Sequence, residues 1–447
     1  MTLAHNIQKI QEKLVIRTFC AAARTVPYYK NLLRGLAVDP TRVRDLRDFT
    51  GRAPILDKNR LFTENLHEIG RIISGNSFSA CEAIFPSSGF SGKFSFGLLR
   101  KGSTKAQGKR LYKALNFVFG ISSKRTLLIN ALSMGISMTV PKVVTVNTGL
   151  RSDIVISVLR TFGAYFDQFI LIGENAFIKK TVEEGEKTGL AWPDINIHVI
   201  FGGESFPESY RTYLESFLGP RPDLLVGASF GFAESGLNVM SETRKSVLIR
   251  RKAALDPGLI SDLVGKTERV SPVFMQYYPF GMYVEAQDGM LLFTDLAGGA
   301  RLPVIRYSTG DEGAIIPYDK AKAVLLDHGL SKCLPDYGLP LVALKGRAEF
   351  LTIGGERIYP DLVKDAIFSD RSLADLTTGY FRMKKKDEAL SVELQLKDDA
   401  PEPVTLINRF KSAVKARVRT EPEMTLYPYG SFPYAMELDY EKKFRYI

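Results

Sequence analysis

Acidic residues are missing from a long stretch near the amino-terminal end of this 447-residue chain. No Asp or Glu occurs between Glu82 and Asp153. Residues 1–125 hold 22 basic side chains and 8 acidic ones, whereas residues 347–447 hold 17 of each kind. The formal net charge of +11 is therefore a local property of the chain. We expect an anionic partner near this part of the molecule.

The chain is also poor in cysteine, in histidine and in long hydrophobic runs. Its three cysteines and four histidines lie far apart, so a disulfide framework or a structural zinc site is not expected. No apolar run approaches the roughly 18 residues that a membrane-spanning helix needs. Ile7, Ile10 and Leu14 are spaced as one face of a helix, with Lys13 and Arg17 among them, which is not the pattern of a signal peptide. We therefore predict a cytoplasmic protein.

Hydrophobic periodicity indicates an α/β fold. The first 80 residues have a helical pattern, and from residue 126 strand-like runs alternate with helix-length segments, which predicts βα units around mixed or largely parallel sheets. The strand-like runs are Thr126–Asn130, Phe169–Ile172, Ile197–Phe201 and Leu224–Val226, and the helix-length segments include Ser152–Phe162 and Pro207–Leu218. Short β-like pieces at Gly289–Thr294 and Val304–Arg306 predict a smaller antiparallel layer.

The last hundred residues have the pattern of a separate, small α+β unit. Two strand-like segments, Thr377–Met383 and Ala389–Leu396, are followed by a segment with the apolar spacing of a helix. The predicted organisation is a large amino-terminal domain of residues 1–345 and a small carboxy-terminal domain of residues 346–447.

Serine, glycine and lysine are concentrated in the segment Pro86-Ser87-Ser88-Gly89-Phe90-Ser91-Gly92-Lys93. Backbone N–H groups and hydroxyls of such a loop can converge on phosphate oxygens, while glycine permits close approach and lysine adds positive charge. The segment is not a Walker loop, because two residues separate its glycines and Phe94 follows the lysine. An ordinary flexible turn is the alternative interpretation.

Two glycine-containing segments that include a glutamate lie near the ends of predicted strands. They read Phe201-Gly202-Gly203-Glu204 and Phe230-Gly231-Phe232-Ala233-Glu234-Ser235-Gly236. In a parallel sheet both would lie at the carboxyl ends of strands, where open α/β sheets bind ligands. Glu234 offers an oxygen ligand of the kind that Mg²⁺ prefers. A pair of exposed loop glutamates is the alternative.

Three more segments carry candidate binding residues. The segment Pro303–Asp311 has the pattern of a strand that ends in a Gly-Asp turn, and Asp311 could accept hydrogen bonds from the hydroxyls of a ribose. A glycine-rich segment, Lys345–Pro360, lies at the predicted domain boundary. The third segment, Tyr440–Arg445, is a charged run near the carboxy-terminal end.

In their order and separations, these segments resemble those of the adenylate-forming superfamily of acyl-CoA synthetases, peptide-synthetase adenylation domains and luciferases. The chain is most similar to the phenylacetate-CoA ligase branch, also at Thr25–Tyr29 and Ala53–Lys58, so the resemblance covers nearly the whole sequence. It implies a large amino-terminal domain that binds ATP and the acyl substrate, and a small α+β lid. It also implies ATP and Mg²⁺ as cofactors and coenzyme A as co-substrate.

The resemblance further implies roles for individual residues. The residues of the loop that would hold the β- and γ-phosphates of ATP are Ser87, Ser88, Gly89, Ser91, Gly92 and Lys93. The residues near adenine would be Gly202, Gly203, Glu204, Phe230 and Gly231. Phe90, Ser91 and Phe94 stand where the family has two threonines and a proline, so one hydroxyl is lost.

The remaining implied roles concern the metal, the ribose, the hinge and the catalytic lysine. Glu234 would hold Mg²⁺, Asp311 would bind the ribose and Arg347 would contact the nucleotide. The hinge would fall on Glu349. Lys443 is the implied catalytic lysine and Lys442 the alternative, because the glycine that precedes this lysine in the family is missing.

The implied reaction joins a carboxylic acid, aryl or medium-sized and apolar, to AMP and then to a thiol, with coenzyme A as the first choice. Loading of an acidic carrier protein and amide formation are alternatives. A different class is a catalytically inactive relative that binds a polyanion. Nucleic acid is not the expected partner, because no known binding motif occurs and aromatic residues do not alternate with the basic ones.

Overall fold

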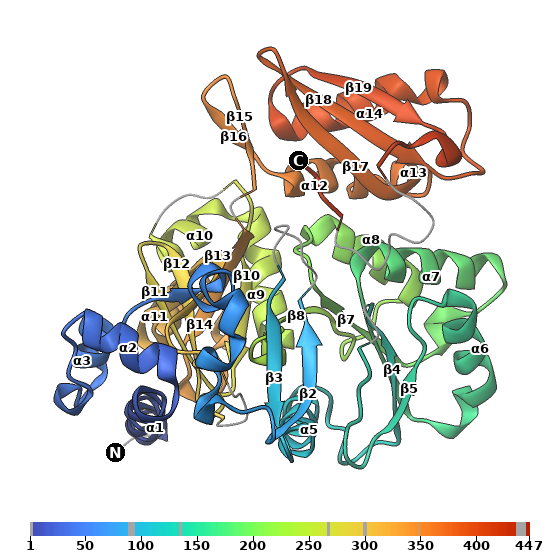
Figure 1. Ribbon diagram of the computed structural model, residues 1–447. Helices are drawn as coiled ribbons and strands as arrows, with labels where there is room; N and C mark the ends of the chain where they lie inside the picture. The colour runs from blue at the N-terminus through green and yellow to red at the C-terminus, as the bar shows by residue number, and fades with distance from the viewer. Residues whose placement is uncertain are drawn as a thin grey trace. The chain divides into compact units, whose positions relative to one another are not determined.

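The computed structural model describes residues 3–87, 94–133, 136–265, 269–297, 302–347, 349–434 and 444–447. The chain forms two compact units, each built from separate stretches of sequence. The first unit consists of Met1–Phe119, Ser229–Thr267 and Pro272–Arg347, and the second of Gly120–Ala228, Glu268–Ser271 and Ala348–Ile447. The predicted α/β class is confirmed, and the carboxy-terminal region has its own sheet and helices (Figure 1). The domain boundary at residues 345 and 346 stays a prediction.

Helices dominate the start of the first unit, as the sequence predicts. They are α1 (Leu3–Thr25), α2 (Pro27–Gly35), α3 (Leu46–Arg52) and α4 (Lys58–Leu61), with 3₁₀ turns η1 (Pro40–Arg42), η2 (Thr63–Ile72) and η3 (Ser74–Asn76). Helix α1 buries Val15 and Phe19 against this region, whereas Ile10 is 48% exposed. The predicted apolar face of this helix is therefore wrong at Ile10, because packing against α2 and α3 selects a different side.

An antiparallel layer follows in the first unit, also as predicted. Its strands run in the order β11-β12-β13-β14-β10-β9, and β1 pairs in parallel with β13. Their bounds are β1 (Leu56–Asp57), β9 (Gly236–Ser241), β10 (Val273–Tyr277), β11 (Met282–Gln287), β12 (Met290–Asp295), β13 (Tyr307–Ile316) and β14 (Leu341–Arg347). The helical elements are α9 (Arg244–Leu255), α10 (Pro257–Val264), α11 (Tyr318–Asp327), η6 (Ser331–Cys333) and η7 (Asp336–Gly338).

One predicted strand of this layer is wrong. Val304–Arg306 is not a strand, because Arg306 has a φ of 45°, which an extended chain does not adopt. The turn carries the buried Arg306 guanidinium to Glu285, at 2.6 Å, and to the carbonyl of Ala53, at 2.7 Å. Strand β13 begins one residue later, at Tyr307.

A two-stranded hairpin and a long helix complete the first unit. The hairpin pairs β2 (Cys81–Pro86) with β3 (Phe96–Arg100), and α5 (Ser103–Phe119) follows it. Gly97 in β3 lies so close to the chain at Ala233 that a Cβ atom at position 97 would stand 1.8 Å from the Ala233 carbonyl oxygen. The main chain of the hairpin at Gly97 therefore contacts the main chain of the segment that contains Glu234.

Parallel strands form the first part of the second unit. They run in the order β7-β6-β4-β5 and are β4 (Thr126–Ala131), β5 (Val144–Asn147), β6 (Gln168–Gly173) and β7 (Ile197–Gly202). The helical elements are α6 (Ser152–Phe162), η4 (Gly163–Tyr165), α7 (Asn175–Lys187), η5 (Trp192–Asp194) and α8 (Glu208–Leu218). The predicted βα alternation is confirmed, although β8 (Val226–Phe232) starts where the prediction Leu224–Val226 ends. Its first three residues belong to the second unit, and the others, from Ser229, belong to the first.

The carboxy-terminal elements of the second unit match the predicted α+β pattern. They are the hairpin β15 (Leu351–Ile353) and β16 (Glu356–Ile358), then α12 (Pro360–Phe368), α13 (Arg371–Ala374), β17 (Thr377–Lys386), β18 (Ala389–Leu396), α14 (Pro403–Val418), β19 (Pro422–Tyr427) and η8 (Tyr429–Ser431). Strands β17, β18 and β19 form one sheet. Helix α14 buries Leu406, Phe410 and Val414 on one side.

A buried lysine joins α7 to this carboxy-terminal sheet within the second unit. Lys179 Nζ donates to Glu183 Oε1 at 2.6 Å and to the carbonyl of Thr377, in β17, at 2.7 Å. Burial lowers the pKa of Lys179 to about 8, although the negative charge of Glu183 acts to raise it. Within the described ranges, no helix is long and apolar enough to cross a membrane.

We expect Gly97→Ala to lower the free energy of unfolding by about 1–3 kcal/mol or more, because the added methyl overlaps the Ala233 carbonyl. Gly51→Ala in α3 is the control, since nothing lies within 4 Å of its added Cβ. The control should be neutral or slightly stabilising. Urea unfolding of both variants measures the difference, and equal effects would contradict the close contact.

The stability that depends on Lys179 should change with pH. Its folded pKa of about 8 lies below its ordinary value of 10.5, so unfolding takes up a proton between these values and stability rises with pH in this window. From pH 8 to 10.5, the free energy of unfolding of the wild type should rise by up to about 3 kcal/mol relative to that of Lys179→Met. Urea unfolding of both proteins across this pH range tests the prediction. Lys180→Met, at a partly exposed neighbouring position, should show no such dependence.

Candidate active site

A buried carboxylate lies at the turn between β8 and β9. Glu234 is only 5% exposed, so the alternative of an exposed loop glutamate is wrong for this residue. The hydroxyl of Tyr307, at the start of β13, donates to Glu234 Oε1 at 2.6 Å. Burial and then the charge of Glu234 raise the pKa of Tyr307, while the charge of Arg347 opposes this shift. Tyr307 therefore stays protonated and acts as the donor.

Aromatic rings of the same unit stack next to Tyr307, the hydrogen-bond donor to this carboxylate. Phe230 in β8 stacks on Phe293 of β12, with ring centroids 5.4 Å apart and planes 21° apart. Phe232 stacks on Tyr307 with centroids 5.9 Å apart. Gly231 lies between the two phenylalanines and is exposed. The strand thus places one backbone position without a side chain beside a stacked aromatic wall.

Asp311 and Arg347 lie directly across from each other on β13 and β14. Asp311 accepts a hydrogen bond from the hydroxyl of Thr309 at 2.6 Å. The predicted strand that ends in a Gly-Asp turn is wrong, because Asp311 lies inside β13. There the pairing with β12 shifts register, and Gly310 takes a φ of 86° that only glycine adopts readily.

The described end of the predicted phosphate loop lies close to Glu234 along the hairpin. Ser87 Oγ accepts from the backbone N–H of Ser95 at 2.9 Å, and Lys58 Nζ donates to the same oxygen at 3.4 Å. Two residues after Ser95, Gly97 contacts the chain next to Glu234. The other predicted loop residues, Ser88, Gly89, Ser91, Gly92 and Lys93, lie outside the described residues, as do the candidate lysines Lys442 and Lys443.

Gly202, Gly203 and Glu204 belong to the second unit, at the end of β7 and just after it. Glu204 Oε2 accepts hydrogen bonds from Lys364 Nζ at 3.4 Å and from the Tyr446 hydroxyl at 3.2 Å. Lys364 Nζ also lies 4.1 Å from the centre of the Tyr446 ring. The sequence prediction missed both partners. The available signal was a lysine within the apolar run of α12.

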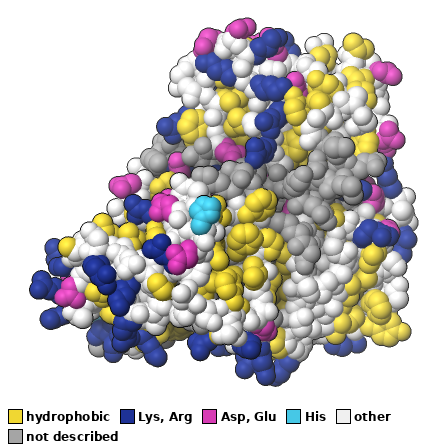
Figure 2. Space-filling view, in the orientation of Figure 1, with side chains coloured by type: hydrophobic (Ala, Val, Ile, Leu, Met, Phe, Trp, Pro, Cys, Tyr) yellow, Lys and Arg dark blue, Asp and Glu magenta, His cyan; other side chains and the backbone are white. Residues whose placement is uncertain are grey.

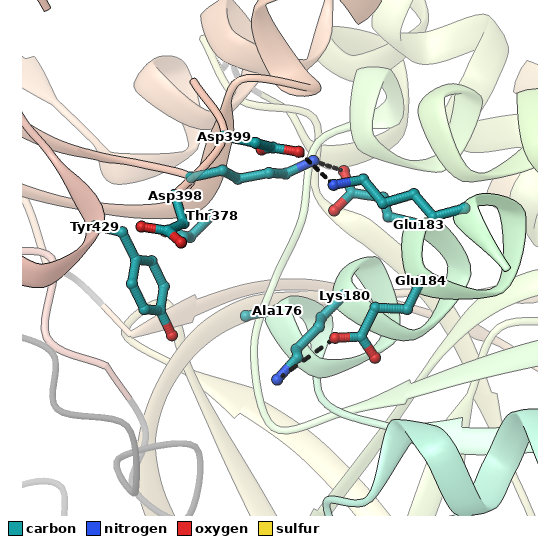
Figure 3. A pocket seen from close by; sticks show the side chains of 10 residues that line it. Ala176, Lys180, Glu183, Glu184, Thr378, Asp398, Asp399 and Tyr429 are labelled. Atoms are coloured by element: carbon teal, nitrogen blue, oxygen red, sulfur yellow. Dashed lines mark hydrogen bonds and ion pairs between the residues drawn. The ribbon is translucent and has the colours of Figure 1, made fainter. Parts of the chain in front are cut away.

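The pocket in Figure 3 is a different site. It encloses about 450 Å³ between α7 and the carboxy-terminal elements of the second unit. Its lining consists of Ala176, Lys180, Glu183, Glu184, Lys187, Thr378, Lys397, Asp398, Asp399 and Tyr429. Its lysines pair with its carboxylates, as Lys397 does with Glu183 at 2.8 Å. None of the predicted site residues lines it.

Solved structures of CoA ligases resemble the chain along nearly its whole length. A 2-hydroxyisobutyryl-CoA ligase in a postadenylation state with R3-HIB-AMP has 14% identity and a TM-score of 0.70, over 98% of this chain and 88% of that one. The chain has the fold of this ligase. No protein-family model and no curated sequence matches it.

Two more structures share this CoA ligase fold. An open conformation of the 2-hydroxyisobutyryl-CoA ligase, in complex with 2-HIB-AMP and CoA, has 14% identity and a TM-score of 0.57 over 98% of this chain and 90% of that one. An anthranilate CoA ligase in complex with anthranoyl-AMP has 11% identity and a TM-score of 0.52 over 81% of this chain and 65% of that one. At these identities the likeness concerns the fold.

Tyr307→Phe should lower the free energy of unfolding by about 1–3 kcal/mol, because it leaves the buried Glu234 carboxylate without this donor. Tyr29→Phe is the matched control. Its ring is equally buried in the first unit, and its hydroxyl has no hydrogen-bond partner among the described residues. Denaturant unfolding compares the two variants. A loss in the control as large as that in Tyr307→Phe would contradict the role of the Tyr307 hydroxyl.

Proposed function

We propose that this protein activates a carboxylic acid with ATP to give an acyl-adenylate and then transfers the acyl group to a thiol. The observation that supports this most is the group formed by Glu234, Tyr307, Asp311 and Arg347 beside the aromatic wall of β8, on a CoA ligase fold. It combines a buried carboxylate, a second carboxylate for hydroxyl groups and a guanidinium for phosphate oxygens. These are the groups that a nucleotide requires.

The residues present fit a magnesium ion that enters with the nucleotide. Mg²⁺ commonly takes one or two protein carboxylates together with substrate phosphates. Glu234 supplies one buried carboxylate that Tyr307 holds in place. Within the described ranges, no group of three or more His, Cys, Asp and Glu side chains could hold a metal ion. The ion would neutralise phosphate charge when bound.

The protein's own part in the first step is to bind and orient the nucleotide. Asp311 would accept hydrogen bonds from the ribose, and Arg347 would pair with phosphate oxygens. The loop from Ser87 to Lys93 would hold the β- and γ-phosphates, with Gly202, Gly203, Glu204, Phe230 and Gly231 around the adenine. Such positioning and neutralisation account for most of the catalysis of phosphoryl and nucleotidyl transfer.

Two successive nucleophilic substitution reactions then form the thioester. A carboxylate oxygen of the substrate attacks the α-phosphorus of ATP, and the bond from the α-phosphorus to the β-bridging oxygen breaks, which releases pyrophosphate. A thiolate sulfur next attacks the carbonyl carbon, and the bond from this carbon to the AMP oxygen breaks. Lys443 would place positive charge at the carboxylate and α-phosphate in the first step. A rotation of the carboxy-terminal domain about Glu349 would then move Lys443 away.

Coenzyme A is the proposed acceptor, since a solved ligase with this fold holds 2-HIB-AMP and CoA. The acid is proposed to be aryl or medium-sized and apolar. A protein-bound thiol is the alternative acceptor.

Exchange of labelled pyrophosphate into ATP, measured over a panel of acids, tests the proposal. We expect exchange that depends on one class of acid. Lys443→Ala should lower it by about 100-fold or more while leaving thioester formation from supplied acyl-adenylate. Lys442→Ala is the matched control. Lack of exchange with every acid, together with salt-sensitive binding of polynucleotide or anionic vesicles, would instead favour the inactive polyanion binder.

A further inference from the structure

Helix α5 carries three lysines in a line on its outer side. Lys105, Lys109 and Lys113 are each four residues apart and exposed, and we refer to them as the α5 lysine row. No carboxylate lies within ion-pair distance of these three lysines in the part of the chain that the structure describes. Figure 2 shows Lys and Arg side chains gathered along the lower margin of the molecule, where α5 lies in Figure 1.

The row is electrostatically unfavourable for the free helix. Like charges four residues apart repel each other on a helix surface, whereas a carboxylate at the same spacing attracts. Helix α7 has the favourable arrangement, with Lys180 Nζ 3.7 Å from a carboxylate oxygen of Glu184. Among the described residues, Glu82 accepts from the backbone N–H of Gly102, just before α5 begins, and does not pair with the row. The repulsion within the row would be relieved by an anionic partner.

The inner side of α5 supports the candidate site. A Cβ atom at Gly236, two residues from Glu234, would stand 3.2 Å from Gln107 Nε2, so α5 contacts the start of β9 there. Arg110 Nη2 donates to the carbonyl of Ala297 at 3.1 Å. Because an α-helix with its side chains is about 10–12 Å across, a partner on the row would be about one helix diameter from this turn.

Exposed aromatic rings lie at the carboxy-terminal end of the row. Phe117, in the next turn after Lys113, is 45% exposed and contacts Tyr337, which is 58% exposed, with ring centroids 5.6 Å apart. Lys113 Nζ lies 5.9 Å from the centre of the Tyr278 ring, which is 44% exposed. Aromatic residues with a charged margin are typical of protein–protein interfaces.

We propose that the α5 lysine row and the rings of Phe117, Tyr278 and Tyr337 form a docking surface for an acidic helical face of another protein, of the kind that an acyl carrier protein presents. The inference rests on the proposed function with its alternative acceptor, a protein-bound thiol, because such a partner would bring this thiol to the adenylate. Successive lysines of the row are about 6 Å apart along the helix axis, which matches carboxylates four residues apart on a partner helix.

The helix favours a protein over a membrane or a nucleic acid. A helix that lies in a membrane interface needs a continuous apolar outer face. On α5 the apolar residues Leu115 and Phe119 are buried, and Phe117 is the one large apolar residue exposed among its described side chains. Single-stranded nucleic acid would need rings interleaved along the lysines. Among the described residues, the exposed rings next to the row lie at its carboxy-terminal end.

The test measures binding of a holo acyl carrier protein by calorimetry, without ATP. The triple variant Lys105→Glu, Lys109→Glu, Lys113→Glu should bind about 10-fold or more weakly than the unsubstituted protein. The matched control is Lys9→Glu, Lys13→Glu, Arg17→Glu on α1, where exposed cations have the same spacing but the helix packs with α2 and α3. The control should bind within about threefold of the unsubstituted protein, and binding should weaken as salt is added.

Three outcomes would overturn the proposal. The unsubstituted protein could show no saturable binding of the carrier protein, or both triple variants could bind it equally weakly. In the third outcome, the unsubstituted protein binds phosphatidylserine vesicles or polynucleotide tightly, and the α5 variant loses this binding but still binds the carrier protein normally. Pyrophosphate exchange separates this result from the proposed function. The α5 variant should keep the exchange rate of the unsubstituted protein. Absence of exchange in the unsubstituted protein would overturn the proposed function, whereas the binding result is obtained without catalysis.

Discussion

The buried charge of Glu234 constrains much of the first unit. A carboxylate that is almost fully buried needs a donor, and Tyr307 supplies it from the first residue of β13. That requirement places the start of β13 against the turn after β8. It also stacks Phe232 on the Tyr307 ring. On the other side of the turn, only glycine at position 97 allows β3 to approach. The hairpin, the aromatic wall and two sheet strands are thus arranged around one charged group.

Sequence patterns predict the regular parts of this fold well and its local departures poorly. The helix expected at Ser152–Phe162 has these bounds as α6, because its apolar face follows the helical period and a strand precedes and follows it. The strand expected at Val304–Arg306 fails because Arg306 adopts a positive φ to reach Glu285. Ile10 fits an apolar helix face in the sequence but not in the packing. Such outcomes depend on partners far away in the chain.

The candidate site shows the same division. The sequence motifs and the family that they resemble predict Glu234, Asp311 and Arg347 as site residues, and the first unit contains all three. The sequence does not reveal that Glu234 is buried or that Tyr307 is its donor, since their separation is 73 residues. Nor does it show that Lys364 and Tyr446 hold Glu204. At 14% identity to a ligase of known structure, the fold is retained because burial patterns tolerate substitution, whereas function must be argued from the site.

The irregular pairing at Asp311 has a consequence for how a ligand would be selected. The hydroxyl of Thr309 already holds this carboxylate, on a strand whose backbone is fixed by Gly310 and by pairing with Arg347. This hydrogen bond restricts the side chain before any ligand arrives, so less entropy remains to be lost on binding. Under the proposed function, a sugar with two neighbouring hydroxyls could donate to both oxygens of this carboxylate, whereas a sugar that lacks one of them could not. Rigidity at this position would therefore be expressed as discrimination between ribose and deoxyribose more than as tight binding.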